Sequence, residues 1–449
     1  MGTGGTFYMP ASPNPTKLSK VNSIDSQSSK PTFYWHYAWV VLAIAVILQM
    51  VGSSIRMAFG VFIDPLSDTF EWDQGNITLA YAINNIVSAL ASPMAGRLGD
   101  YFGTRKAMAL GGTMFIVGML ITGVISHLWQ FYLAYGVFLG IAQAIFLVPM
   151  VPGVMRWYRR QLGWAMGLLM ASWGIGPAIS FPLMSYMIIH LEWKFAFWTT
   201  AFGSAVIIAL LIYLYKNSPS EMNLQPYGSV PGEIIGDPPE TNKAKTSIFI
   251  GHMKKTAAYY NMSSIHFLGC VGHAIILVYL IPIAVREGLS PVSAATILTV
   301  MAIISVPSRI FVPVLSDKFG VRTVMAIFFF LQGITVIMLF WTHEYWTFYL
   351  FALLFGIGYG GESGGFPILN RKYFGYAPQG SPYGFQMFGA SLGMALGGWI
   401  GGEIFVITGT YDIALMISVA ASLAGMASII LLEPTDRLLI PDWESITNE

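Results

Sequence analysis

The sequence predicts an all-α polytopic membrane protein in which twelve transmembrane helices form two six-helix bundles. Of its 449 residues, 55% are hydrophobic and only 10% are charged, whereas soluble proteins carry about a quarter charged residues. The apolar residues fall into long blocks that recur along nearly the whole chain, which leaves no soluble domain of useful size. Landmark residues of the first half also recur in the second half, which indicates two duplicated bundles.

Each apolar block is long enough to cross the hydrocarbon core of a bilayer, for which a helix needs roughly 20 residues. The first half is expected to span the membrane at residues 38–62, 76–96, 107–126, 131–155, 163–189 and 195–215. The second half is expected to span it at residues 257–284, 291–315, 323–341, 347–369, 383–407 and 412–432. The bundles are therefore predicted at residues 38–215 and 257–432.

Three polar segments flank or divide these bundles. Residues 1–37 are rich in Ser and Pro and lack the pattern of a signal peptide, so we expect a disordered cytoplasmic tail. Residues 216–256 are hydrophilic and are predicted to form a cytoplasmic linker between the bundles. Residues 433–449 are predicted to form a cytoplasmic C-terminal tail.

The distribution of basic residues predicts the orientation, because Lys and Arg collect in cytoplasmic loops. If both termini are cytoplasmic, 19 of the 23 Lys and Arg residues fall on the inner side, and only Lys194 and Arg286 fall on the outer side. The other two, Arg56 and Arg309, lie inside predicted spans. We therefore expect a multi-pass protein of the plasma (inner) membrane with both termini inside.

Composition and missing motifs exclude several function classes. The net charge of +1 gives no reason to expect nucleic acid as a partner, and the single Cys270 excludes a disulfide framework or a multi-cysteine metal site. The sequence lacks the phosphate-binding Gly-rich lysine loop that would indicate a primary pump. It also lacks the His-Glu-x-x-His motif that would indicate a zinc-dependent membrane hydrolase. We expect neither an enzyme nor a cofactor. A nutrient sensor that signals through the linker is another alternative, but the linker is short for a signalling module.

The two halves repeat at a nearly constant offset, which is typical of transporters with a substrate site between the halves near the bilayer midplane. The equivalent pairs are Asp100 with Asp317, Arg156 with Arg371, and Trp193 with Tyr411.

The loop predicted after the second span resembles the signature loop of the major facilitator superfamily. Its matching residues are Gly96, Asp100, Gly103, Arg105 and Lys106. We expect Asp100 to accept hydrogen bonds from the N-terminus of a neighbouring helix and from Arg105, and the two glycines to permit a tight turn. The loop after the eighth span is similar to a degenerate second copy, with Asp317 and Arg322. The resemblance implies the major facilitator fold and a role of both loops in conformational exchange.

Within that superfamily the chain resembles the monocarboxylate transporters and their prokaryotic relatives, including the oxalate/formate exchangers. The segment Trp157–Arg160 followed by Ala165-x-Gly167-x-x-x-Ala171 is similar to a monocarboxylate signature, although Gln161, Leu162 and Ser172 depart from it. The resemblance implies a secondary active transporter of small organic monocarboxylates similar to lactate, pyruvate or formate. Transport is expected by alternating access, either coupled to protons or by exchange for a counter-anion.

Two alternative substrates stay open at this point. One is a dicarboxylate such as oxalate, but residues 383–407 lack the Lys that oxalate exchangers are expected to carry. The other is a neutral metabolite or drug.

Arg309 is the strongest candidate for a substrate-binding residue. An Arg deep in a span is costly unless it faces a cavity or a partner, and its planar fork suits a carboxylate. The flanking Pro307 and Pro313 free backbone groups that can line a cavity. The family resemblance agrees, because the substrate-binding Arg of monocarboxylate transporters also lies eight residues before the Asp317 position. The alternative is an Arg that snorkels to the cytoplasmic surface.

The resemblance also implies a proton-relaying Asp four residues before Arg309, where this chain has Ser305. A serine hydroxyl neither gains nor loses a proton near neutral pH, so His273, ahead of His266, is the candidate for proton coupling. Glu362 is a candidate counter-ion or second protonation site. Simple hydrogen bonding between helices is the alternative for each.

The remaining candidates are weaker. Arg56 is expected to capture anions from outside or to snorkel to the outer interface. Tyr81, Tyr279, Tyr359 and Gln143 are expected either to line a polar cavity and contact the substrate or to bridge helices. The expected partners are thus a small organic anion, protons or a counter-anion, and the lipid bilayer.

Overall fold

The computed structural model describes residues 36–445, of which those from Tyr37 onwards form one compact unit. The expected disordered tail lies almost entirely outside the described residues. Helices dominate, and no strand occurs in the described part of the chain, where Tyr158 and Tyr227 form an isolated β-bridge. The predicted all-α class is confirmed.

The first half begins with one helical span and ends with a long helix that crosses twice. It contains α1 (Tyr37–Met57), η2 (Phe59–Phe62), α2 (Ile63–Phe70), α3 (Gln74–Phe102), α4 (Thr104–Thr122), α5 (Leu128–Phe131), a π-helical stretch η3 (Tyr132–Phe138), α6 (Leu139–Leu147), α7 (Met150–Met155) and α8 (Leu162–Leu214). A kink at Glu192, where φ is +69°, divides α8 into two arms that count as two spans.

The second half follows the linker, which contains η4 (Pro219–Met222), η5 (Pro239–Thr241) and α9 (Lys243–Met253). Its helices are α10 (Ala257–Arg286), α11 (Pro291–Phe319), α12 (Val321–Val336), η6 (Ile337–Trp341), α13 (Tyr345–Glu362), α14 (Phe366–Phe374), α15 (Gly380–Thr408) and α16 (Asp412–Ile430). Among the described residues, 11 helices are long and apolar enough to cross a membrane. The 18-residue α13, which is rich in Tyr and Gly, completes the twelve that the sequence predicts.

Helix ends follow local sequence chemistry. Ser290 caps α11 by accepting a hydrogen bond from the Ser293 N–H, and Thr256 caps α10 in the same way. Gly103 ends α3 and Gly320 ends α11, each with a φ near +90° that glycine adopts without strain.

The second and eighth spans extend further than apolar length predicts. Asp100 and Asp317 were expected in loops, but they lie in the last turns of α3 and α11. The prediction was wrong because hydropathy marks only the part of a helix inside the hydrocarbon, whereas the chain stays helical until Gly103 or Gly320 changes direction.

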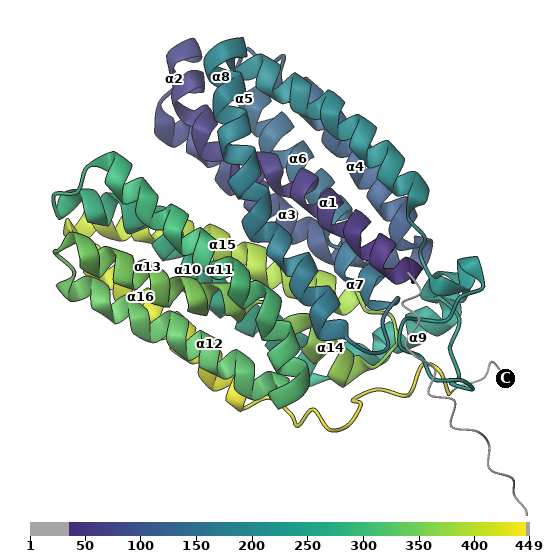
Figure 1. The fold of residues 1–449 in the computed structure, drawn as a ribbon. Coiled ribbons are helices and arrows are strands. Elements are labelled where there is room, and N and C mark those ends of the chain that lie inside the picture. Colours follow the sequence, from purple (N-terminus) through teal and green to yellow (C-terminus); the bar gives the residue numbers. More distant parts are fainter. Residues whose placement is uncertain (1–35, 446–449) are drawn as a thin grey trace, which may run out of the picture. The chain divides into compact units, whose positions relative to one another are not determined.

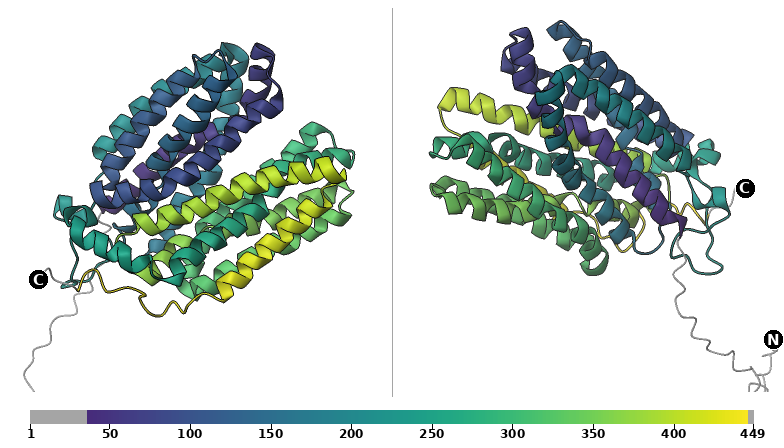
Figure 2. Two further views of the ribbon diagram at one scale, coloured as in Figure 1. Left: turned by 180° about the vertical axis from the view of Figure 1, so that it is seen from behind. Right: turned by 45° about the horizontal axis from the view of Figure 1, so that its top comes forward.

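The helices form two bundles (Figure 1). The first consists of α1, α3, α4, α6 and both arms of α8, and the second consists of α10 to α13, α15 and α16. Between the bundles, α3 runs beside α15 and α8 runs beside α11 (Figures 1 and 2).

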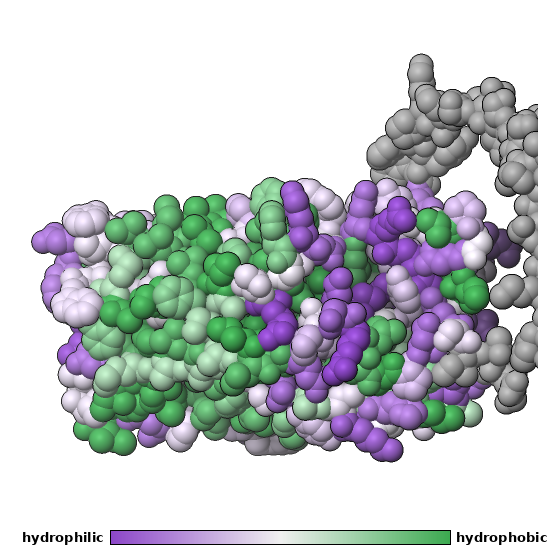
Figure 3. Space-filling view, turned by 90° about the horizontal axis from the view of Figure 1, so that it is seen from below, coloured by the Kyte–Doolittle hydropathy of each residue, from purple (hydrophilic) through white to green (hydrophobic). Residues whose placement is uncertain are grey.

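The outer surface of the bundles is apolar. Figure 3 shows a broad hydrophobic zone, with hydrophilic residues gathered toward the end where the described chain begins and stops. Large side chains such as Leu431 (83% exposed), Val406 (81%) and Ile189 (76%) lie uncovered on this surface. A continuous apolar surface of this extent marks contact with lipid.

Glycines allow the bundles to touch backbone to backbone. A Cβ atom added at Gly96 of α3 would lie 2.0 Å from the Gly380 carbonyl oxygen of α15, and one at Gly384 would lie 2.5 Å from the Ser92 carbonyl oxygen. Gly167 of α8 approaches the Ile310 carbonyl of α11 in the same way. Gly96 therefore serves helix packing, and the expectation that it forms part of a turn was wrong.

Replacing Gly96 with Ala should destabilise the packing of α3 on α15, because the obstructing atom belongs to the backbone and cannot rotate away. We expect a cost of about 1–3 kcal/mol, as for other overpacked sites, seen as a lower melting temperature of the purified protein in detergent. Gly203→Ala is the matched control, since a Cβ there meets nothing within 4 Å. Equal melting temperatures for the two variants would contradict this account.

Candidate functional site

A cavity of about 130 Å³ lies between the two bundles. Side chains of both bundles line it, including Arg56 of α1, Trp173 of α8, His273 of α10, Arg309 of α11, and Tyr359 and Glu362 of α13. With His266 of α10, which also lines it, the cavity brings together six of the residues that the sequence singled out, from both halves of the chain.

Arg309 lies in this cavity with neutral neighbours. Only 6% of the residue is exposed. Its Nε donates a long hydrogen bond of 3.5 Å to Ser305 Oγ, and its Cζ lies 4.7 Å from the centre of the Tyr359 ring. Among residues 36–445 no carboxylate forms an ion pair with it. The guanidinium therefore lacks a counter-ion in the described part of the protein.

Arg56 supplies a second guanidinium from the opposite bundle. It lies in the last turn of α1, and its buried Nε has no hydrogen-bond partner in the described structure. Arg56 also lines a smaller adjoining cavity of about 30 Å³, together with Gln143 and Trp173. The two cavities meet at Arg56, which places this cation at the boundary of both.

A buried histidine and a buried glutamate form a pair on the cavity wall. His273 Nδ1 lies 2.7 Å from Glu362 Oε2, and the Glu362 side chain is 1% exposed. His273 Nε2 lies 3.1 Å from Met394 Sδ of α15, and the edge of the imidazole contacts Tyr359, with 4.9 Å between ring centres. Tyr359 thus contacts both His273 and Arg309.

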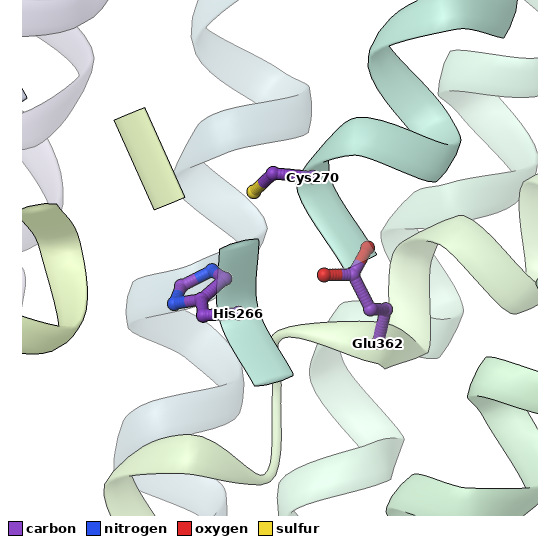
Figure 4. Close-up of side chains that lie close together, drawn as sticks. All are labelled: His266, Cys270 and Glu362. Carbon is purple, nitrogen blue, oxygen red and sulfur yellow. The ribbon is translucent and has the colours of Figure 1, made fainter. Parts of the chain in front are cut away.

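A second histidine and the single cysteine extend this polar wall. Figure 4 shows His266, Cys270 and Glu362, whose potential metal-ligating atoms lie within 4.8 Å of one another. These residue types can bind Zn²⁺, but hydrogen bonds already engage two of them. Gln386 Nε2 lies 3.0 Å from His266 Nδ1, and Glu362 contacts His273. We therefore assign the cluster to the wall of the cavity.

Several predicted contacts lie elsewhere. Tyr279 does not line the cavity; its hydroxyl donates a hydrogen bond of 2.5 Å to the Gly398 carbonyl of α15. The Tyr81 ring packs on Phe59 at 5.2 Å between centres. Gln143 donates to the Gly52 carbonyl. These three side chains bridge helices, which was the alternative given for them, and Gln143 also lines the smaller cavity beside Arg56.

Among the lining residues that sequence reasoning missed are Trp173, Tyr383 and Gln386. Tyr383 and Gln386 lie one helical turn apart in the glycine-rich start of α15. That spacing on one helix face was the available signal for them. Trp173 has no comparable signal, because tryptophans are common throughout the predicted spans.

Hydrogen bonds join the two bundles at the end that carries the linker, which we call the linker end. The fully buried Asp100 carboxylate accepts from the backbone N–H groups of Gly380 (2.9 Å) and Ser381 (2.7 Å), the first residues of α15. Arg156 Nη2 lies 3.6 Å from the same carboxylate. The helix N-terminus and the cation both favour the ionised acid.

Arg105 does not reach Asp100, contrary to expectation. It donates to the Ile212 and Tyr213 carbonyl oxygens at the C-terminus of α8, at 2.9 and 3.0 Å. Terminal carbonyls of a helix lack intrahelical partners and attract cations, which explains the preference. Lys106 is exposed.

The second half repeats these contacts with reversed roles. Asp317 Oδ2 of α11 accepts a 2.8 Å hydrogen bond from the Gly163 N–H at the start of α8, and Arg322 donates to the terminal Ile429 and Ile430 carbonyls of α16. One and the same sequence offset relates Asp317 to Asp100, Gly380 to Gly163, Arg322 to Arg105, and Ile429 to Ile212. Each bundle therefore holds the other through the same contact.

The C-terminal segment adds to this closure. Arg159 of the first half hydrogen-bonds to Glu444, and its Cζ lies 3.4 Å above the ring of Tyr376 in the second half. Burial opposes the charge of Arg159, but the hydrogen bonds to Glu444 and Tyr376 outweigh it and raise the pKa of the guanidinium. Arg371 donates to the Met155 and Tyr158 carbonyls across the interface.

A family model described as Major Facilitator Superfamily matches residues 42–318 and again residues 262–447. The chain is 23% identical over 387 residues to the oxalate:formate antiporter of Oxalobacter formigenes, with 82% of this chain and 88% of that protein covered. It is 25% identical over 408 residues to monocarboxylate transporter 13 of Bos taurus, covering 88% and 89%. With monocarboxylate transporter 2 of Homo sapiens the identity is 23%, covering 73% and 71%.

A solved structure has a similar fold. The proton:xylose symporter, bound to 6-bromo-6-deoxy-D-glucose, superposes with a TM-score of 0.69 at 12% identity, covering 87% of this chain and 94% of the symporter. At this identity the likeness establishes the fold alone. The predicted arrangement of twelve helices in two bundles is confirmed.

Replacing Asp100 with Asn should loosen the linker end. The variant loses a charged acceptor, which is worth about 1.5–3 kcal/mol, so we expect open forms to become roughly tenfold more populated. Spin labels at the exposed Lys106 and Lys318, on a Cys270→Ser background, would report a longer distance distribution. Asp317→Asn should have a smaller effect, because Asp317 is exposed and accepts from one backbone amide. Unchanged distances in Asp100→Asn would refute this account.

Proposed function

The chain belongs to the major facilitator superfamily, and we propose that it is a secondary active transporter that moves small organic monocarboxylates by alternating access. The relatives named above include an oxalate:formate antiporter and two monocarboxylate transporters. We further propose that the linker end faces the cytoplasm of the cell, in the plasma (inner) membrane, as the distribution of basic residues favours.

The observation that carries the proposal is the lack of a counter-ion at Arg309 among the described residues. A buried guanidinium is stable only with an anion or water around it, and the Arg309 surroundings within the described residues offer Ser305 and Tyr359. An incoming carboxylate accepts two parallel hydrogen bonds from the guanidinium fork. The substrate thus supplies the charge that the cavity lacks.

The balance of charge in the whole cavity supports the same conclusion. Its lining contains two guanidinium groups, Arg56 and Arg309, against one carboxylate, Glu362. His273 already engages that carboxylate. A net positive cavity within the protein favours an anion over a neutral solute, because charges interact more strongly there than in bulk water.

The closed linker end supports alternating access. The α3–α15 and α8–α11 contacts hold the bundles together at the linker end, and with that end in the cytoplasm, as proposed, this arrangement corresponds to a state closed on the inner side. Transport requires the bundles to rock about the cavity and break these contacts. Asp100 and Asp317 would then control the rate of exchange between states and not recognise substrate.

A dicarboxylate is the second candidate, and the position of Arg56 favours it. α15 lacks a lysine, but Arg56 brings a second cation to the same cavity from α1. A short dicarboxylate such as oxalate could pair with both guanidinium groups.

Uptake into proteoliposomes decides between these candidates. Labelled lactate, pyruvate, formate and oxalate would be offered one by one, with the unlabelled acid inside, and a neutral sugar would serve as the negative control. Exchange of a monocarboxylate supports the first candidate, exchange of oxalate alone supports the second, and uptake of the neutral solute alone would overturn both.

Arg309→Lys should weaken binding of the transported anion, because Lys keeps the charge but loses the bidentate fork. Arg309→Ala should weaken it further, by about 2–5 kcal/mol, as measured when one partner of a desolvated charge pair is removed. Binding would be followed by isothermal titration in detergent. Arg286→Ala is the matched control, because Arg286 lies at the end of α10 over Phe405, away from the cavity. Near-normal affinity of Arg309→Ala would rule out the carboxylate proposal.

Arg56→Ala separates the two substrate classes. For a monocarboxylate bound at Arg309, loss of the second cation should reduce affinity less than tenfold, since the direct pair remains. For a dicarboxylate paired with both cations, the loss should approach that of Arg309→Ala. The same titrations, performed with pyruvate and with oxalate, provide the measurement.

A further inference from the structure

We propose that one coupling proton is held between His273 and Glu362, and that its binding is linked to binding of the anion at Arg309. The inference rests on the proposed function and names the group that couples transport to protons. Ser305, which accepts a hydrogen bond from Arg309, neither gains nor loses a proton near neutral pH.

The contacts of His273 determine how many protons the pair holds. A thioether sulfur accepts hydrogen bonds weakly and cannot donate them, so a hydrogen bond between His273 Nε2 and Met394 Sδ, which lie 3.1 Å apart, needs its hydrogen on Nε2. The 2.7 Å contact of Nδ1 with Glu362 Oε2 requires a second hydrogen between those atoms. A neutral imidazole has only one N–H. When both hydrogen bonds form, the pair holds one proton more than a neutral histidine beside a carboxylate does.

That proton has two equivalent descriptions. Either the imidazole carries both hydrogens and Glu362 is ionised, or the imidazole is neutral and Glu362 is protonated. Loss of the proton leaves one hydrogen for two contacts, so either the Met394 or the Glu362 contact must break. Protonation is thus tied to the packing of α10 against α13 and α15.

Among the groups that line the cavity, the His273–Glu362 pair is the one that we assign to proton exchange. From α10 it faces His266 and Cys270, from α11 Arg309, from α13 Tyr359, from α15 Tyr383 and the neutral Gln386, and from α1 Arg56. Glu362 is the only carboxylate among the described residues that line the cavity. His266 contacts Gln386 and forms no ion pair within residues 36–445.

The ring of Tyr359 places the proton site next to the anion site. Arg309 Cζ lies 4.7 Å from the ring centre, and the imidazole centre lies 4.9 Å from it. An anion at Arg309 cancels the positive charge that otherwise repels a proton on the pair. Because linkage is reciprocal, the proton strengthens anion binding by the same factor, and we expect roughly tenfold.

The resulting cycle is balanced in charge and protons. One proton from the outer solution enters the Nδ1–Oε2 contact, and one carboxylate of charge −1 pairs with Arg309. The loaded cavity gains no net charge. After the bundles rock, the carboxylate leaves, the uncovered Arg309 repels the proton, and the proton passes to the inner solution.

Proteoliposomes test the inference through two readouts. Counterflow of a labelled monocarboxylate at equal pH measures binding and exchange, and accumulation driven by an acidic outer solution measures coupling. His273→Gln and Glu362→Gln should each lower accumulation at least tenfold, but counterflow at saturating substrate less than threefold, because saturation offsets the roughly tenfold loss of anion affinity. Retained counterflow also shows that the variant is folded and inserted.

Two further variants sharpen the result. His343→Gln is the matched control, because His343 Nδ1 lies 2.7 Å from Glu287 Oε2 in an exposed pair far from the cavity. It should leave both readouts unchanged. Met394→Leu should shift the pH dependence of accumulation to more acidic pH, since the imidazole then needs no hydrogen on Nε2.

Each outcome bears on one claim. Accumulation at the wild-type level in His273→Gln and Glu362→Gln overturns this inference, as does equal loss of counterflow and accumulation, which would make the pair part of substrate binding. Wild-type counterflow without pH-driven accumulation overturns the inference and leaves the proposed function intact. Absence of wild-type counterflow for every acid overturns the proposed function, and this inference with it.

Discussion

The architecture depends on a carboxylate that accepts the first backbone amides of a helix in the opposite bundle. Asp100 does this at the start of α15, and Asp317 does it at the start of α8. A helix N-terminus carries partial positive charge and unpaired N–H groups, so the contact is strong at the fully buried Asp100 and weaker at the exposed Asp317. Once water enters, the same groups are solvated at little cost. The contact can therefore hold one state firmly and still be released during a transport cycle.

Close packing makes that contact possible. The carboxylate reaches the α15 amides only because Gly96 lies directly against Gly380 with no side chain between them. In the equivalent place, Gly163 and Gly167 allow α8 to approach the backbone of α11 as closely. The same sequence offset relates the contacts of the two halves, so the duplication preserved their geometry. In each half the glycine, the acid and the arginine that binds the terminal carbonyls of a helix are retained. The Asp100 contact is reinforced by Arg156, which lies beside the same carboxylate. The ion pair between Arg159 and Glu444 holds the neighbouring loops together.

The central cavity follows a different rule, because its charges are unbalanced. Arg309 and Arg56 have no counter-ion among the described residues, whereas the single acid of the lining is paired with His273. Tyr359 contacts both Arg309 and His273 and neutralises neither. Such a site is stable only when solute or water completes it, which suits a protein that must bind and release its ligand in every cycle.

The sequence by itself determined the class of fold, the twelve spans and the duplication, because hydrophobic length and repeated landmarks are local or periodic signals. It also identified Arg309, Arg56, His273 and Glu362, since a charge inside an apolar block is visible without a structure. Only the tertiary structure decided which of them meet. The pairing of His273 with Glu362 spans 89 residues, the partner of Asp100 lies 280 residues away, and Arg105 contacts helix carbonyls instead of the nearby acid. Hydropathy specifies depth along a helix axis but carries little information on its rotation or neighbours, and these two quantities decide every such contact.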